Sequence, residues 1–284
     1  MPLRIWNAPC VSGPPSAEAF PSFSELWEVP AHPRFFEPHT QERNCMNIYE
    51  IGSMAEKLAS NVYPGRGIVL GITPDGKKSV AAYFIMGRSV NSRNRVFIEE
   101  ADGIRTEAHD PSLMQDPSLI IYHPVRELAR SLIVTNGDQT DTIRDGMERG
   151  ETFEAALRTR KFEHDGPNWT PRISGLAMPS GDYKMSILKA ADPEGSACAR
   201  FCWEYPGLPG LGHFLHTYVC DGSPIPTFQG EPERVAMSDD IDAFTAELWD
   251  NLNADNKISL FVRYTDLATR EFEQRILNKH EPKA

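Results

Sequence analysis

Two short polar segments hold the residues with the clearest capacity for chemistry. The first, residues 134–141 (Val-Thr-Asn-Gly-Asp-Gln-Thr-Asp), follows the apolar run 132–134 and precedes a helical pattern. The second, residues 163–172 (Glu-His-Asp-Gly-Pro-Asn-Trp-Thr-Pro-Arg), follows that pattern and precedes the apolar run 173–178. Polar, charged and Gly or Pro residues at such junctions are typical of functional sites. Two ordinary loops with helix-capping residues would have the same composition, so the spacing alone leaves both interpretations open.

The side chains in and near these segments supply proton-transfer groups and neutral hydrogen-bond donors, but no obvious nucleophile. The set comprises Tyr122, Asn136, Asp138, Thr140, Glu163, Asp165, Asn168, Thr170 and Arg172. The sequence has no Gly-x-Ser-x-Gly elbow, which disfavours a serine hydrolase. The set therefore suits proton transfer and oxyanion stabilisation better than covalent catalysis.

Arginines gather near the ends of the expected hairpins. Arg66 precedes the first expected strand, and Arg88, Arg93 and Arg95 crowd into residues 87–95. Four arginines within thirty positions suit bidentate capture of phosphate or carboxylate, although a solvated loop with surface arginines would have the same pattern. The nearby glycines precede a strand instead of following one and opening a helix, so we reject a dinucleotide-binding loop.

The composition limits the possible partners. The net charge of −11 over 284 residues argues against a nucleic-acid partner, because binding a phosphate backbone needs a basic surface. It does not exclude an anionic small molecule held by local arginines. No apolar run approaches the roughly 18 residues of a membrane span, and the N-terminus lacks the plan of a signal peptide.

Cysteine usage indicates a reducing compartment. The five cysteines (Cys10, Cys45, Cys198, Cys202 and Cys220) are scattered and form no Cys-x-x-Cys, which disfavours a zinc site and a disulfide framework. Cys198 and Cys202 fall on one face of an expected strand, where we expect buried thiols. A cytoplasmic location fits these features.

The order of apolar patterns predicts an α+β fold. Residues 1–45, with 8 of the 23 prolines, are expected to be a poorly ordered extension, and residues 46–284 a single domain. Asp-Gly pairs between apolar runs predict successive hairpins, hence antiparallel sheets. The expected strands are 67–72, 79–86, 96–98, 104–106, 119–122, 131–134, 173–178, 183–188, 199–205, 212–220 and 260–262. The first expected helix starts at Met46, and the other expected helices cover 140–149, 152–160, 239–252 and 270–278. Two packed sheets with outer helices, a four-layer sandwich, would account for this count.

Several motifs resemble those of the archaeal-type IMP cyclohydrolases. Residues 134–143 are similar to the family's valine-serine-asparagine-glycine…threonine-aspartate run. Residues 168–173 resemble its asparagine-threonine-proline-arginine-isoleucine motif, with Trp169 inserted. The other matches, in the same order, are Gly65-Arg66, the cluster from Arg88-Ser89 to Asn94-Arg95, and the segment from Asp116-Pro117 to Ile121-Tyr122. Each motif is weak alone, but the ordered set forms a clear resemblance over residues 63–180, while residues 1–45 have no counterpart.

This resemblance implies a fold and a reaction. The fold would be the αββα sandwich of the N-terminal-nucleophile hydrolases, without self-processing. The reaction would be the dehydrative ring closure of 5-formamidoimidazole-4-carboxamide ribonucleotide to IMP in purine biosynthesis, which requires no metal and no redox cofactor.

The resemblance also implies residue roles. Glu163 is expected to transfer protons, while Tyr122 and Asn136 donate hydrogen bonds to the formyl oxygen or the carboxamide. The arginines expected to hold the phosphate are Arg66, Arg88 and Arg95. The remaining substrate-binding candidates are Asp138, Thr140, Asn168, Thr170 and Arg172, of which the last three would contact the base or the ribose.

Two other functions stay open at this point. An N-terminal-nucleophile-type amidohydrolase would need a Cys, Ser or Thr freed at a new terminus; Cys45 is the candidate, although it precedes a helical pattern. A catalytically silent purine-nucleotide-binding protein could have kept the arginines. The sequence is compatible with a homo-oligomer but does not define one.

Overall fold

The computed structural model describes residues 47–114 and 121–280. Within these ranges the chain is an α+β protein built on two antiparallel sheets, as the successive hairpins predict. The prediction for residues 1–45 lies outside the described residues. None of the helices in the described ranges is long and apolar enough to cross a membrane.

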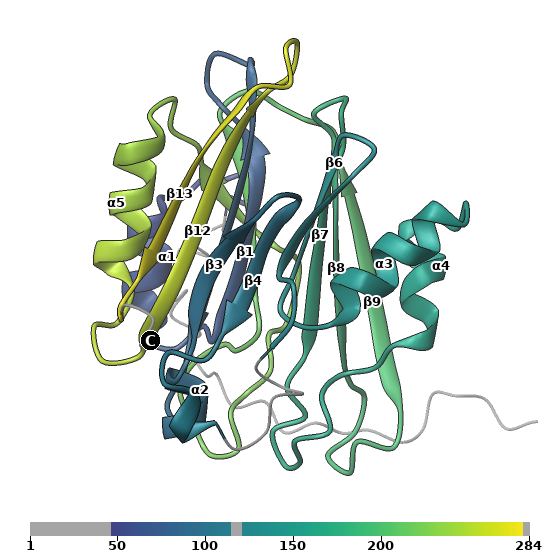
Figure 1. Cartoon of the computed structure of the whole chain (residues 1–284), viewed down its shortest axis with the longest axis vertical. Coiled ribbons are helices and arrows are strands. Elements are labelled where there is room, and N and C mark those ends of the chain that lie inside the picture. Colours follow the sequence, from purple (N-terminus) through teal and green to yellow (C-terminus); the bar gives the residue numbers. More distant parts are fainter. Residues whose placement is uncertain (1–46, 115–120, 281–284) are drawn as a thin grey trace, which may run out of the picture. The chain divides into compact units, whose positions relative to one another are not determined.

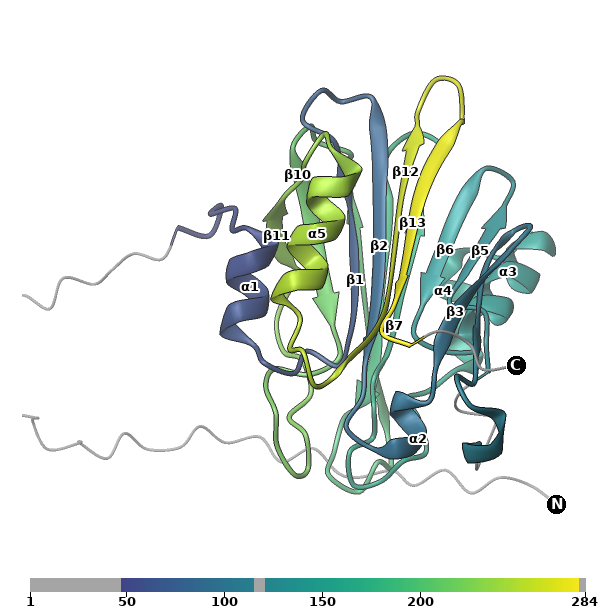
Figure 2. The same cartoon turned by 60° about the vertical axis from the view of Figure 1, so that its left-hand side comes forward.

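One sheet has six strands and the other has seven (Figures 1 and 2). In spatial order the first consists of β11 (Glu233–Ala236), β10 (Leu211–His216), β1 (Arg66–Ile72), β2 (Lys78–Met86), β12 (Lys257–Asp266) and β13 (Phe272–Asn278). The second consists of β3 (Val96–Glu100), β4 (Gly103–Glu107), β5 (Val125–Leu128), β6 (Ser131–Thr135), β7 (Arg172–Ala177), β8 (Tyr183–Ala190) and β9 (Cys198–Tyr205).

Apart from the short helix α2, the α-helices of the described ranges lie on the outer faces of the sheets (Figure 1). The α-helices are α1 (Met54–Ser60), α2 (Val90–Arg93), α3 (Gln139–Glu148), α4 (Phe153–Ala156) and α5 (Ile241–Asn251), and the 3-10 turns are η1 (Pro111–Leu113) and η3 (Leu157–Thr159). Helices α1 and α5 pack on the six-stranded sheet, whereas α3 and α4 pack on the seven-stranded sheet. Thr152 caps α4 as predicted, since its side chain accepts a hydrogen bond from Ala155 N.

The alternation of side chains along β1 and β2 builds two cores at once. Ile68 and Tyr83 point between the two sheets, while Val69 and Phe84 point toward α1 and α5. Successive strand residues face opposite sides, so strands covered on both faces are apolar throughout. The close contact between the sheets needs Gly175, because a Cβ there would lie 2.9 Å from Leu70 Cδ1.

The predicted helix over 270–278 is wrong, because these residues form β13. The chain reverses through Arg270, whose φ of +71° no right-handed helix permits. Phe272–Asn278 then pairs along β12, and the Asn278 side chain bonds to the backbone of Phe97 on the other sheet. A nine-residue helix is marginal by itself, whereas the free edge of β12 offers a complete ladder of hydrogen bonds.

Other boundaries also differ from the sequence prediction. The first helix begins at Met54, because Ser53 and Glu56 form a reciprocal capping box, and Ile48 and Ile51 stay exposed. Ile121 and Tyr122 lie outside any strand, and the rest of that expected strand is outside the described residues. The sequence did not predict α2, β5 or β11, which are only four residues long.

The expectation of buried thiols in β9 is wrong. Cys202 is exposed and Cys198 only partly buried. The strand is an edge strand of the seven-stranded sheet and has β8 as its sole strand neighbour in the described part of the chain. An edge position leaves much of a strand open to solvent, which the apolar pattern does not reveal.

Glu233 on β11 ties α1 to the six-stranded sheet. Its carboxylate lies 2.8 Å from Lys57 Nζ and 3.1 Å from His216 Nε2. Burial acts to raise the pKa of Glu233, but the hydrogen bonds from His216 and Lys57 outweigh it and lower the pKa to about 2.

This pKa predicts a pH-dependent contribution to stability. The ordinary value is 4.5, so the carboxylate stabilises the fold fully above pH 4.5 and loses this effect as the pH falls toward 2. We expect Glu233→Gln to lower the free energy of unfolding by about 1 kcal/mol at pH 7. The difference from wild type should shrink in acid, as measured by urea denaturation at stepped pH. The exposed Glu194→Gln is the control, and a difference that grows in acid would contradict the prediction.

Candidate active site

A cavity of about 280 Å³ opens at one end of the two sheets. Its walls come from four segments: the start of β1, the connection from β2 to β3, the loop before β7 and the loop after β10. The lining residues are Tyr63, Arg66, Arg88, Ser89, Asn91, Ser92, Arg95, Glu163, Asp165, Asn168, Thr170, Tyr218 and Ile225. The cavity thus brings together the three arginines, Glu163, Asn168 and Thr170 from the predicted site.

Strand register explains why these segments meet. Arg66 begins β1 opposite Ile85 near the end of β2, and Gly67 pairs with His216 at the end of β10. Helix α2, which follows β2, marks this end of the molecule in Figures 1 and 2. Gly65 lets the chain enter β1 directly beneath Tyr218: its φ is +77°, and a Cβ there would lie 2.5 Å from the Tyr218 ring.

Two arginines of the site, the buried Arg95 and the partly buried Arg66, carry buried nitrogen donors that are not hydrogen-bonded within the described residues. Arg95 is 2% exposed; its Nε donates to Ser92 O at 2.8 Å, but its Nη2 has no hydrogen-bond partner among residues 47–114 and 121–280. Within the same ranges, Arg66 Nε and Asn91 Oδ1 are also buried without a hydrogen-bond partner. An unsatisfied buried polar atom costs about 1–3 kcal/mol, so such a group is retained where a ligand can pair with it. These donors suit an oxygen-rich or anionic ligand.

Glu163 lies among these charges and is itself 8% exposed. Burial raises the pKa of its carboxyl, and the neighbouring Arg66, Arg172 and Arg95 oppose that rise without cancelling it. Burial and repulsion from Arg66 lower the pKa of Arg95. For Arg66, burial acts to lower the pKa, but Glu163 together with Tyr218, Tyr63 and Tyr122 outweighs that effect and raises the pKa. A buried carboxyl whose pKa moves toward neutrality can both give and take a proton.

An aromatic and hydroxyl wall faces Glu163. Tyr63 stacks on Tyr218 with ring centroids 5.9 Å apart, and the Arg88 guanidinium lies 5.2 Å from the Tyr63 centroid. Arg88 also pairs with Asp221 and keeps 37% of its side chain exposed. It therefore sits at the rim of the cavity, whereas Arg66 and Arg95 are deeper.

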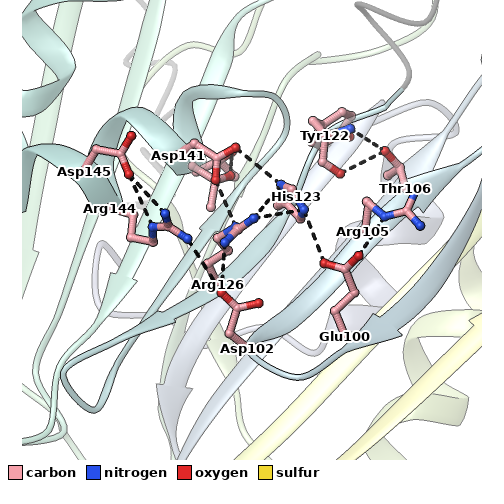
Figure 3. A network of polar contacts seen from close by, with 12 residues as sticks. Glu100, Asp102, Arg105, Thr106, Tyr122, His123, Arg126, Asp141, Arg144 and Asp145 are labelled. Atoms are coloured by element: carbon pink, nitrogen blue, oxygen red, sulfur yellow. Dashed lines mark hydrogen bonds and ion pairs between the residues drawn. The ribbon is translucent and has the colours of Figure 1, made fainter.

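Tyr122 lies behind the arginines and not in the cavity lining. Its hydroxyl is 2.9 Å from the Tyr83 hydroxyl. Burial raises the pKa of Tyr83, whereas the nearby Arg66 and Arg95 act to lower it. Its backbone exchanges hydrogen bonds with Thr106 of β4, next to an ion-pair network that joins His123, Arg126 and Asp141 (Figure 3). Tyr122 thus lies close enough to Arg66 and Arg95 to act on their pKa values, which its charge would raise.

The first polar segment does not line this cavity, since Asn136, Asp138 and Thr140, which were expected to contact the substrate, are not among the lining residues. Asn136 donates to Pro171 O and accepts from Ile173 N, both at 2.8 Å. Thr140 Oγ1 is 2.6 Å from Thr135 Oγ1, which closes the turn locally. These groups have buried partners of their own, so this segment fixes the start of β7.

Asp138 and Arg172 also act outside the cavity. Asp138 pairs with Arg172 at 2.7 Å and with Arg160, and the two arginines lower its pKa against the effect of burial. Arg172 lines a neighbouring hollow with Arg160, Lys161 and His164. The pair therefore links the two predicted segments without facing Asn168 or Thr170.

Sequence reasoning missed part of the lining. Tyr218 falls within the predicted strand 212–220 and was not singled out as a site residue, whereas β10 ends at His216. Ser89 and Ser92 belong to the arginine-rich segment, and their reciprocal capping of α2 was a usable signal. Within residues 47–114 and 121–280, no three His, Cys, Asp or Glu side chains gather as they would around a metal ion.

A family model described as "IMP cyclohydrolase-like protein" matches residues 63–270. The chain belongs to this family. All the residues that line the cavity, from Tyr63 to Ile225, fall inside the matched range. The family therefore shares the part of the chain that forms the site.

Relatives within this family come from archaea. The IMP cyclohydrolase of Methanopyrus kandleri is 30% identical over 186 residues, which cover 59% of this chain and 90% of the relative. That of Halobacterium salinarum is 31% identical over 133 residues, covering 45% of this chain and 64% of the relative. That of Methanococcus aeolicus is 28% identical over 163 residues, covering 56% of this chain and 75% of the relative.

The contacts of Asn136 predict a structural role that can be measured. Asn136→Ala leaves Pro171 O and Ile173 N without partners in a buried place, so we expect the free energy of unfolding to fall by about 2–3 kcal/mol. Urea denaturation measures the loss. Asn251→Ala removes an exposed amide on α5 and should change stability by less than about 0.5 kcal/mol. Equal effects of the two variants would refute this role.

Proposed function

We propose that this chain is an enzyme that converts 5-formamidoimidazole-4-carboxamide ribonucleotide to IMP with loss of water. The observation that carries the proposal is a buried carboxyl, Glu163, that lines a cavity of about 280 Å³ together with the buried Arg95 and the partly buried Arg66. This volume is just below the range of about 300–1,000 Å³ that is usual for small-molecule sites. Membership of the family and the activity for which its relatives are named support the same reaction.

The chemistry asks for the groups that the cavity offers. The carboxamide nitrogen must attack the formyl carbon, and the formyl oxygen gathers negative charge as the bond forms. Preorganised donors stabilise that charge most strongly in a water-poor site. Water must then leave with the help of an acid. Both reacting groups belong to one substrate, so holding them in contact provides much of the rate.

Glu163 is our candidate for direct proton exchange with the substrate. Its carboxyl lines the cavity, and its raised pKa lets it hold a proton closer to neutral pH than an ordinary glutamate does. Arg66 and Arg95 are beside it, with donors that have no partner in the described part of the chain. We therefore assign these two arginines to the formyl and carboxamide oxygens, a role first considered for Tyr122 and Asn136.

The phosphate is better assigned to the rim. A phosphate next to Glu163 would repel the carboxylate and displace the reacting end of the substrate. Arg88 is at the cavity mouth with Ser89 and Ser92, so we place the phosphate there. Asn168 stays a candidate for the ribose or base, while Asp138, Thr140 and Arg172 would act by holding the loop before β7.

The finer fold and the surroundings are part of this proposal. We propose that two facing sheets with α1 and α5 outside one and α3 and α4 outside the other form the αββα arrangement of the N-terminal-nucleophile hydrolases, without self-processing. Residues 46–284 would then be one domain, acting in the cytoplasm and able to form a homo-oligomer. The rival amidohydrolase depends on Cys45, which lies outside the described residues.

Replacing Glu163 tests the proton-transfer role. Glu163→Gln keeps the shape of the side chain but cannot exchange a proton, so we expect kcat to fall by about 10²–10³-fold while IMP binding changes less than about threefold. A spectrophotometric cyclisation assay and calorimetric IMP titration measure the two effects. Glu148→Gln, at the exposed end of α3, is the control. If the wild-type protein binds IMP tightly but shows no turnover, it is a catalytically silent nucleotide-binding protein.

The arginine assignment predicts a separation of KM from kcat. Arg88→Ala should raise KM at least about tenfold and leave kcat within about threefold, because it removes ground-state binding of phosphate. Arg95→Lys should mainly lower kcat, because a lysine cannot reproduce the planar fork of donors. Arg93→Ala is the matched control in the same segment, since Arg93 bonds to Gly87 O and Asn256 Oδ1 outside the cavity. The reverse pattern for Arg88 and Arg95 would exchange their roles.

A further inference from the structure

We infer that the Tyr218 hydroxyl is a second proton-transfer group of this site, connected through Thr170 to the Asp165 carboxylate. The inference rests on the proposed ring closure and adds a partner for Glu163. Tyr218, Thr170 and Asp165 all line the same cavity as Glu163. They come from two separate loops, before β7 and after β10, that the fold brings together.

The three side chains form a continuous chain of hydrogen bonds. Thr170 Oγ1 lies 2.6 Å from the Tyr218 hydroxyl and also contacts Asp165 Oδ2. Asp165 Oδ1 accepts a further bond from Thr170 N at 2.7 Å, which fixes the carboxylate in place. The Tyr218 ring is held by its stacking on Tyr63 and by burial, since it is 2% exposed.

The direction of this chain follows from the inventory of donors. An ionised Asp165 can only accept, so the Thr170 hydroxyl donates to Asp165. Thr170 then has only lone pairs left for Tyr218, so the Tyr218 hydroxyl donates to Thr170. The free lone pair of the Tyr218 oxygen is thus the atom that can accept a proton in the cavity. When Asp165 receives a proton, every bond reverses and Tyr218 becomes a donor.

This reversal supplies the proton transfers of the addition step. The carboxamide nitrogen bonds to the formyl carbon, and the C=O π pair moves to the oxygen, which takes a proton from protonated Glu163. The nitrogen, now positively charged and acidic, gives its proton to Tyr218. The Tyr218 proton passes to Thr170 and the Thr170 proton to Asp165. A neutral carbinolamine, a Glu163 carboxylate and a protonated Asp165 result.

The dehydration step returns both groups to their starting states. The C–O bond breaks, and the hydroxyl leaves as water with a proton from Tyr218 while the chain resets to an ionised Asp165. The former formamide nitrogen gives its proton to Glu163, and its electron pair forms the C=N bond. One water is lost, and no other reactant is consumed. Two carboxyl groups in different environments thereby exchange the roles of acid and base.

Substitutions in the relay, compared by KM and kcat, test this inference. Tyr218→Phe keeps the ring stack and removes the hydroxyl, and Thr170→Val removes the middle of the chain, so each should lower kcat at least about tenfold. KM should change less than about threefold for both. Thr170→Ser keeps the hydroxyl and should restore kcat to within about threefold of wild type. Tyr205→Phe, which loses only a hydroxyl bond to Glu231, should match wild type.

The outcomes separate the inference from the proposed function. Wild-type protein and Tyr205→Phe that both lack cyclisation would refute the function itself. Active wild type with a Tyr218→Phe kcat within twofold of it would overturn the relay alone. A rise in KM at unchanged kcat would also overturn it, since that pattern indicates binding only. Thermal unfolding and IMP titration of each variant confirm that it is folded. If Tyr218→Phe is unstable, the kcat values of Thr170→Ser and Thr170→Val decide whether the relay operates.

Discussion

The site depends on holding the Glu163 carboxyl and two arginines close together in one cavity without a direct ion pair between them among the described residues. Glu163 raises the pKa of Arg66 against the effect of burial, yet the two groups form no direct ion pair among the described residues. A directly paired carboxylate would be strongly held in its charged form and would exchange protons poorly. The low dielectric constant of the cavity keeps the attraction strong although the groups are not in contact. The lack of contact leaves the donors of Arg66 and Arg95 available.

The two sheets make that arrangement possible. The cost of burying these charges must be met by the surrounding fold, and both faces of β1 and β2 are packed in apolar cores. The strands bring four loops to one end, so residues far apart in sequence, such as Tyr63 and Tyr218, stack directly. Local contacts then fix the loops: Asn136 holds the chain on both sides of Arg172, and Asp165 holds Thr170.

The differences between the sequence prediction and the structure have a common origin. The segment 270–278 has helix-forming residues, yet it became β13 because the edge of β12 was free to pair with it. Cys202 has an apolar context but lies on an outer strand, where the pattern of burial is lost. Asn136 is a polar residue in a motif, yet its side chain bonds to the backbone of Pro171 and Ile173 and to the Gln139 side chain. In each case a neighbour distant in sequence decided the outcome.

The sequence by itself determined the antiparallel hairpins, the capped helix after Thr152, the family and the arginines with Glu163 that meet in one cavity. These features rest on local patterns: turn chemistry, alternation of apolar residues and motif order. Only the tertiary structure decided which polar groups face the cavity and which hold the backbone. That choice depends on which loops converge and which donors find buried partners, and no local pattern records it. Tyr218 is the clearest case, because its role exists only beside Thr170 from another loop.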